Sequence, residues 1–202
     1  MTPALFHWPE IPSLPPMGAP VVVCVGINPC RAVARQQLRD AARVILGSWV
    51  ALSPDQIQLR ETERGPVYAH KLGGAPVALS FSYCDNAGWI ALLRGAAVGI
   101  DALRVQPFAE MESVAANYLG PAALAEVAAD ADPPRRFARA WTAHEARLKL
   151  AGRALVEWST TSAVMLTAQA REYSLERDDT IVTLVAHPDQ FAPSPCSASV
   201  SM

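Results

Sequence analysis

The chain has 202 residues, of which 51% are hydrophobic and 18% charged, and its formal net charge is −2. This apolar content excludes an intrinsically disordered chain, and the small net charge argues against a surface built for nucleic acid. Residues 1–20 lack the basic start and apolar core of a signal peptide, and the sequence contains no span long enough to cross a bilayer. The four cysteines show no metal-ligand spacing, so we expect free thiols in a cytoplasmic protein.

The first half of the chain is expected to form a sheet with one long helix. Residues 1–20 are rich in proline and predict an extended segment, whereas residues 21–25 are a β-branched run typical of a buried strand. Residues 31–49 predict an amphipathic helix. Its apolar stripe consists of Leu38, Ala42, Ile45, Leu46 and Trp49, and arginines at four-residue steps stand at 31, 35, 39 and 43. Further strands are expected at 57–59, 76–82 and 89–93.

The second half repeats this order of strand, helices and strands. Strands are expected at 97–102, 160–166, 172–175 and 180–186, and helices at 108–118, 121–129 and 137–150. We therefore predict an α+β fold of two pseudo-duplicated halves with a cleft between them. The expected segments are an extended N-terminus at 1–20, halves at 21–96 and 97–187, and a flexible tail at 188–202.

Two segments contain residues suited to chemistry at this cleft. Asp101 ends a short apolar run, as a buried strand would end where it emerges into a cleft. Glu145 and Lys149 lie one helical turn apart and face the same way. Magnesium prefers one or two carboxylates and completes its coordination with water and phosphate oxygens, so these residues predict a magnesium and phosphate site. The alternative is that Glu145 and Lys149 form only a surface ion pair.

Basic residues are concentrated in the second half. Between Arg135 and Arg153 the sequence has six arginines and lysines, opposed only by Glu145. This distribution predicts an acidic partner or a phosphate ligand, and the alternative is a solvated helix face.

The order and spacing of these motifs resemble a known family. Val98-Gly99-Ile100-Asp101 precedes Phe137-x3-Trp141-Thr142-x2-Glu145-Ala146-x2-Lys149-x2-Gly152, a pattern similar to that of 4′-phosphopantetheinyl transferases. The match is closer to the larger, monomeric, surfactin-synthetase-activating type. Leu79-Ser80-Phe81-Ser82 stands where the family has Leu-Ser-His-Ser, and Arg64-Gly65-Pro66 stands near a Gly-Lys-Pro turn. Ala186-His187-Pro188 resembles the end of the last strand.

The resemblance implies transfer of the 4′-phosphopantetheine arm of coenzyme A to a serine of an acyl, aryl or peptidyl carrier protein. Such transfer serves fatty acid, polyketide and nonribosomal peptide biosynthesis and releases adenosine 3′,5′-bisphosphate. The implied enzyme is a magnesium-dependent monomer whose partners are coenzyme A and an acidic carrier protein, without nucleic acid or membrane. The arginines between Arg135 and Arg153 would meet the acidic helix of the carrier.

The family pattern also implies roles for individual residues. Asp101 and Glu145 would bind magnesium, and the proton of the attacking hydroxyl would pass to Glu145 or to a metal-bound water. The catalytic set is Glu145, Lys149 and His144, and the set binding coenzyme A is Arg35, Arg39, Arg43, Arg64, Ser80, Phe81 and Lys149. Among these, Arg35, Arg39 or Arg43 would pair with the 3′-phosphate.

Three positions depart from the family pattern. Leu103 replaces an acid, Phe81 replaces the histidine of the Ser-His-Ser strand, and His144 replaces a lysine. Each change removes a polar contact from the expected site. The alternative function is therefore a catalytically impaired relative that binds carrier protein or coenzyme A as an adaptor or regulator. A third possibility is an acyltransferase that uses coenzyme A, with His144 as its base.

Overall fold

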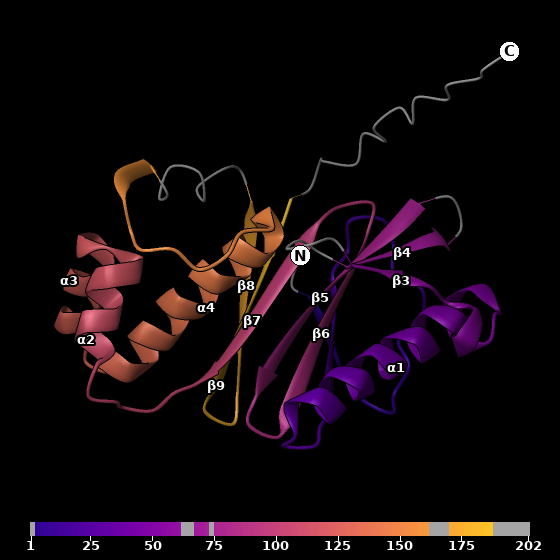
Figure 1. Ribbon diagram of the computed structural model, residues 1–202, viewed down its shortest axis with the longest axis horizontal. Helices are drawn as coiled ribbons and strands as arrows, with labels where there is room; N and C mark the ends of the chain where they lie inside the picture. Colours follow the sequence, from indigo (N-terminus) through magenta and orange to yellow (C-terminus); the bar gives the residue numbers. More distant parts are fainter. Residues whose placement is uncertain (1–2, 62–66, 73–74, 162–169, 188–202) are drawn as a thin grey trace, which may run out of the picture.

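The computed structural model describes residues 3–61, 67–72, 75–161 and 170–187. Two sheets lie next to each other, and a long helix covers the outer face of each (Figure 1). This arrangement confirms the expected α+β class. In the described residues one sheet has six strands and the other three, so the expected pseudo-duplication of the halves is not confirmed. None of the described helices is long and apolar enough to span a bilayer.

The first sheet takes all its strands from residues 4–94. Its elements are β1 (Ala4–His7), β2 (Val21–Gly26), β3 (Leu59–Arg60), β4 (Val67–Leu72), β5 (Ala75–Cys84) and β6 (Ala87–Arg94). The strand order is β1-β2-β6-β5-β4-β3, with β1 parallel to β2 and the other neighbours antiparallel. The sequence analysis did not predict β1 or β4 as strands, and it placed β3 two residues too early.

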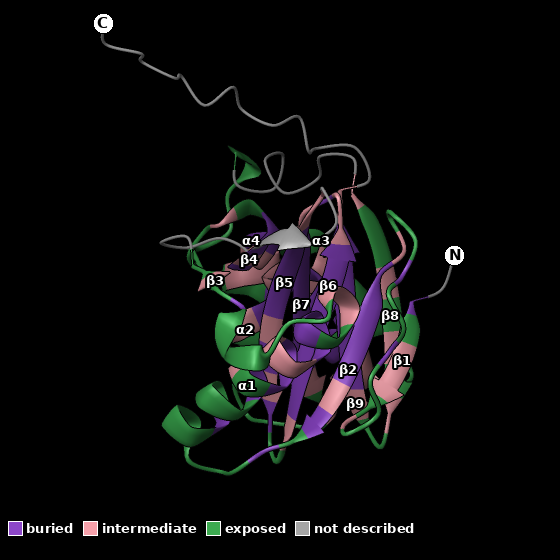
Figure 2. Ribbon diagram, turned by 90° about the vertical axis from the view of Figure 1, so that its right-hand side faces the viewer, coloured by how far each residue is buried: buried purple, intermediate pink, exposed green. Residues whose placement is uncertain are grey.

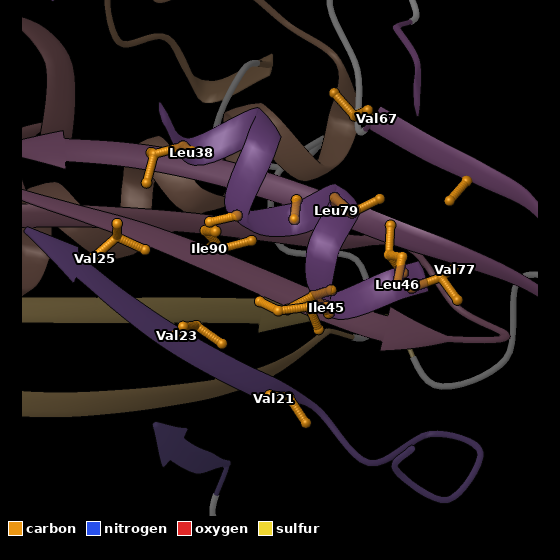
Figure 3. Packing of buried hydrophobic residues seen from close by; sticks show 14 of the residues in the cluster. Val21, Val23, Val25, Leu38, Ile45, Leu46, Val67, Val77, Leu79 and Ile90 are labelled. Atoms are coloured by element: carbon orange, nitrogen blue, oxygen red, sulfur yellow. The ribbon is translucent and has the colours of Figure 1, made fainter. Parts of the chain in front are cut away.

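Helix α1 (Arg31–Val50) covers one face of this sheet, followed by the short 3-10 helix η1 (Pro54–Gln56). Its expected apolar stripe is confirmed, because Leu38, Ala42, Ile45 and Leu46 are buried and Trp49 packs against the same cluster. Figure 3 shows Leu38, Ile45 and Leu46 of α1 against alternate residues of the strands. These strand residues include Val23 of β2, Val77 and Leu79 of β5 and Ile90 of β6. Alternation along a strand therefore leaves the intervening residues for the opposite face.

The opposite face packs on the second sheet, which contains β7 (Val98–Arg104), β8 (Arg171–Arg177) and β9 (Thr180–Ala186) in the order β7-β9-β8. Its neighbouring strands are antiparallel. Val98, Ile100 and Ala102 of β7 join the buried cluster between the sheets. The intervening residues, including Asp101, face the other way. Figure 2 shows the burial of the central strands and the exposure of the outer side of α1.

Helix α4 (Pro133–Ala151) covers the outer face of the second sheet through contacts with β7 and β9. Gly99 allows this close approach, because a β-carbon at Gly99 would lie 2.0 Å from the carbonyl oxygen of Ala146. The α4 helix begins at Asp132, whose side chain accepts a hydrogen bond from the Arg135 N–H, and ends at Gly152 in the left-handed region.

The connection between β7 and α4 contains α2 (Met111–Val114), the π-helical turn η2 (Ala115–Leu119) and α3 (Pro121–Ala129). The helix expected from residue 108 begins only at Met111, and Phe108, which precedes it, packs edge-on against Phe137 with ring centroids 5.2 Å apart. The strand expected at 160–166 is wrong at its start, where Thr160 and Thr161 are helical. Residues 162–166 and the expected tail at 188–202 lie outside the described residues.

Candidate active site

Asp101 lies where the two sheets meet. Its strand, β7, is an edge strand of the second sheet, and it runs beside β5 of the first. The N–H groups of Ile100 and Ala102 donate to the hydroxyls of Ser80 and Ser82 at 3.1 and 3.0 Å. The Ser82 hydroxyl in turn donates to Oδ1 of Asp101 at 2.9 Å. Side chains of β5 therefore provide the acceptors that a neighbouring strand would otherwise supply.

The ammonium group of Lys149 joins the two halves of the chain at the same point. It donates to Oδ1 of Asp101 at 2.7 Å, to the carbonyl of Ile100 at 2.9 Å and to the carbonyl of Phe81 at 3.4 Å. An ammonium group has three protons, so these three acceptors use its full capacity. In this structure Lys149, predicted as a phosphate contact, is the ion-pair partner of Asp101, with 31% of its side chain exposed.

Glu145 lies one turn before Lys149 on α4 and interacts with Asp101. Burial raises the pKa of Glu145, the charge of Asp101 raises it further, and Lys149 lowers it. A raised pKa is expected for a carboxyl group that loses water contact beside a second acid. The structure thus brings together Asp101, Glu145 and Lys149, which come from a strand and a helix far apart in the sequence.

Asp101 and Glu145 supply carboxylates, the ligand type that magnesium prefers. In the described residues no three or more His, Cys, Asp or Glu side chains form a metal-type group. Two carboxylates suffice for magnesium, which fills its other positions with water and substrate phosphate oxygens. Both hydrogen bonds to Asp101 from the described residues use Oδ1, so they leave Oδ2 for a cation. A divalent ion would also stabilise the ionised form of Glu145, which burial and Asp101 disfavour.

Two of the three departures from the family pattern lie beside this pair. Leu103 follows Asp101 on the same face of β7 and packs with Val114 and Trp141 in an apolar cluster. The ring of Phe81 packs against the cluster beneath α1, and the guanidinium carbon of Arg39 lies 5.5 Å from the ring centroid. Apolar packing therefore occupies both positions at which the family has polar side chains.

The third departure, His144, lines a different cavity. This cavity of about 520 Å³ lies between α3, α4 and β8 and is also lined by Arg139, Arg147 and Glu172. The Nε2 atom of His144 is buried and has no hydrogen-bond partner among the described residues. Burial lowers the pKa of His144, and the nearby charge of Arg147 lowers it further. A neutral imidazole is therefore the favoured form.

The arginines of α1 differ in their surroundings. Arg39 is the most enclosed: its side chain is 14% exposed and pairs with Glu61, whose pKa this bond lowers. Arg43 donates to Asp40 at 2.9 Å, and Arg35 is exposed. The expected coenzyme A ligand Arg64 lies outside the described residues.

Sequence reasoning missed Ser82 and the acids that oppose the arginines of α4. The alternation of β5 was the available signal for Ser82, since it places Ser80 and Ser82 on one face, opposite Phe81. Most of these acids were not foreseen because they belong to elements other than α4. In the described residues Arg135 pairs with Asp132, Glu176 and Asp179, Arg136 pairs with Glu126, Arg139 with Glu176, and Arg147 with Glu172. The basic face is consequently partly neutralised by the protein itself.

Comparison with known proteins shows what this part of the chain is similar to. Residues 97–190 match the family model of the 4′-phosphopantetheinyl transferase superfamily, and that segment includes Asp101, Glu145 and Lys149. The segment that contains these three residues is therefore similar to this superfamily.

A particular relative is the 4′-phosphopantetheinyl transferase HetI of Nostoc sp. strain PCC 7120. It is 27% identical over 117 residues, which cover 56% of this chain and 49% of the relative. The chain spans about half the length of this curated relative.

Proposed function

We propose that the protein transfers the 4′-phosphopantetheine arm of coenzyme A to a serine hydroxyl of an acyl or peptidyl carrier protein. The observation that carries this proposal is the 2.7 Å ion pair between Lys149 and Asp101, which joins the helix of Glu145 to β7 inside the segment that matches the superfamily. The alternative of a simple surface ion pair between Glu145 and Lys149 is not supported, because the Lys149 ammonium donates to Asp101 and two backbone carbonyls.

The reaction places a limited set of demands on the protein. The serine oxygen forms a bond to the phosphorus that carries the pantetheine arm, and the bond to the bridging diphosphate oxygen breaks. Adenosine 3′,5′-bisphosphate leaves, and the hydroxyl proton must pass to a base. Glu145 or a metal-bound water would serve as this base.

Magnesium held by Asp101 and Glu145 would supply neutralisation of the diphosphate charge. The protein fixes one of these ligands firmly, since Asp101 is bonded to Ser82 and Lys149. Lys149 would then act mainly by holding Asp101, and it would reach a phosphate only by releasing a present acceptor.

Recognition of the two substrates is proposed to use the arginines. Arg39 lies beside Phe81, so this α1 arginine contacts the β5 segment of the site. A 3′-phosphate at Arg39 would replace Glu61, whereas Arg35 is exposed and accessible without exchange. A carrier protein with an acidic helix would compete with Glu126, Glu172 and Glu176 for the α4 arginines. Carrier binding should therefore weaken as salt increases.

Transfer is tested by incubating the protein with coenzyme A, magnesium and a panel of apo carrier proteins, and weighing the carriers by mass spectrometry. Wild-type protein should add one phosphopantetheine group to at least one carrier. Asp101→Ala and Glu145→Ala should abolish the mass gain and retain the wild-type circular dichroism. Glu10→Ala removes an exposed carboxylate remote from the site and serves as the control. Full transfer by either site variant would overturn the assignment.

A non-catalytic binder of coenzyme A or carrier protein is the second candidate. It is favoured by the apolar packing of Leu103 and Phe81, which leaves the site with fewer polar groups than the family pattern. Calorimetric titration separates the two functions: binding of coenzyme A or carrier without any mass gain would support the binder. The acyltransferase alternative gains no support, because His144 lines the cavity beside α3 and β8.

A further inference from the structure

The hydroxyl of Ser82 has a defined orientation. It lies between the backbone N–H of Ala102, at 3.0 Å, and Oδ1 of Asp101, at 2.9 Å. A backbone N–H can only donate, and an ionised carboxylate can only accept, so the hydroxyl proton must point to Asp101. Ser82 is 3% exposed and Asp101 is 8% exposed, which limits competition from water for this bond.

We propose that Ser82 is a positioning residue that holds Asp101 with Oδ1 turned toward the protein and Oδ2 available for a divalent cation. This inference rests on the proposed function, because the cation is the one required for phosphopantetheine transfer. Ser82 and Lys149 both donate to the same oxygen, Oδ1. Two donors on Oδ1 restrict rotation of the carboxylate, so that Oδ2 is the oxygen left to bind a cation.

Comparison with Ser80 shows that a serine of β5 can accept a backbone N–H of the edge strand β7 without a hydrogen bond to Asp101. Ser80 and Ser82 lie two residues apart on the same face of β5, and each accepts one backbone N–H of β7. Only Ser82 has a carboxylate acceptor for its proton in the described residues. Ser80→Ala and Ser82→Ala therefore remove equivalent backbone contacts, and they differ in the bond to Asp101.

The first measurement is manganese binding to the full-length protein, followed by electron paramagnetic resonance without coenzyme A or carrier. Ser82→Ala should weaken binding by about 10- to 100-fold, the usual effect of removing a group that orients a metal ligand. Ser80→Ala should remain within about twofold of wild type, and Ser82→Thr, which keeps the hydroxyl, within about threefold. Equal weakening by Ser80→Ala and Ser82→Ala would overturn the proposal, since it would show a general loss of structure.

The second measurement needs neither metal nor transfer. Urea midpoints of Ser82→Ala, Asp101→Ala and the double variant form a thermodynamic cycle, because either change removes the hydrogen bond, and the positioning contact predicts midpoint shifts that are not additive. Additive shifts would overturn the role of Ser82 even if the protein binds manganese. Coupled shifts with no Asp101-dependent manganese binding would instead refute the cation site, and with it the metal-dependent form of the proposed function.

Discussion

Substitution of Gly99 by alanine should separate α4 from β7 and thereby damage both stability and the site. The added β-carbon would lie 2.0 Å from the carbonyl oxygen of Ala146 and 2.8 Å from the amide nitrogen of Leu150. Favourable contacts between carbon atoms lie at roughly 3.5–4.0 Å, so the helix would have to move by about 1 Å or more. Both opposing atoms belong to the helix backbone and cannot avoid the contact by changing a rotamer.

Overpacking of this kind costs about 1–3 kcal/mol, and the rigid backbone places Gly99→Ala at the upper end, about 3 kcal/mol. For a chain of this size, 1 kcal/mol corresponds to roughly 2–4 °C, so the melting temperature should fall by about 6–12 °C. Urea unfolding followed by tryptophan fluorescence measures the change. Because α4 carries Glu145, manganese binding should weaken in the same variant.

Gly26→Ala is the matched control. No atom lies within 4 Å of a β-carbon at Gly26, and its φ angle is not in the left-handed region. This variant should equal wild type or gain up to about 1 kcal/mol, because alanine restricts the unfolded chain. If the free energies of unfolding of Gly99→Ala and Gly26→Ala differed by less than about 0.5 kcal/mol, the close packing of α4 on β7 would be refuted.

Three further predictions concern individual polar groups. Lys149→Met should lower the free energy of unfolding in urea by about 1–3 kcal/mol, because it leaves the buried Asp101 without its ion-pair partner. Partial exposure of Lys149 favours the lower end of this range. An unchanged free energy of unfolding would contradict the ion pair. Glu145→Gln should raise the melting temperature at neutral pH. Burial raises the pKa of Glu145, so the acid contributes stability below its unfolded pKa that is lost as pH rises through its folded pKa. The gain from Glu145→Gln should thus shrink as pH falls through the folded pKa of Glu145 and be lost below about pH 4, and a pH-independent difference would refute this cause. Thr142→Val should cost about 1–2 kcal/mol by breaking the 2.7 Å bond to the buried Thr183 hydroxyl, and adding Thr183→Val should cost less than a second independent loss.

Local periodicity was sufficient to predict the elements that carry the site. The apolar stripe of α1 and the pattern around Glu145 both follow the helical repeat, and each helix is present within a few residues of its expected bounds. Strand β7 was also expected, but the prediction that Asp101 ends it is wrong, because β7 runs from Val98 to Arg104. The grouping of Asp101, Glu145 and Lys149 was predicted from the strand and helix patterns and supported by the resemblance to a family, and their catalytic roles stay predictions.

Local sequence patterns could not predict the contacts between elements. The role of the Ser82 hydroxyl depends on the register of β5 against β7, which belong to different sheets. The basic face of α4 was judged from its own residues, whereas Glu172 and Glu176 reach it from β8. Strand β1 was missed because the surrounding prolines favoured an extended segment, although Ala4–His7 pairs with β2. Each of these outcomes depends on residues distant in the sequence.

The contact of β5 with β7, where the two sheets meet, has a consequence for fragments of the protein. The superfamily match begins at residue 97, so a fragment cut there would keep Asp101 and Lys149 but lose Ser80, Ser82 and the Phe81 carbonyl. Its β7 would become an open edge, available for pairing with another copy. Such a fragment should self-associate, and adding residues 1–96 as a separate chain should restore its solubility if the two pieces reassemble.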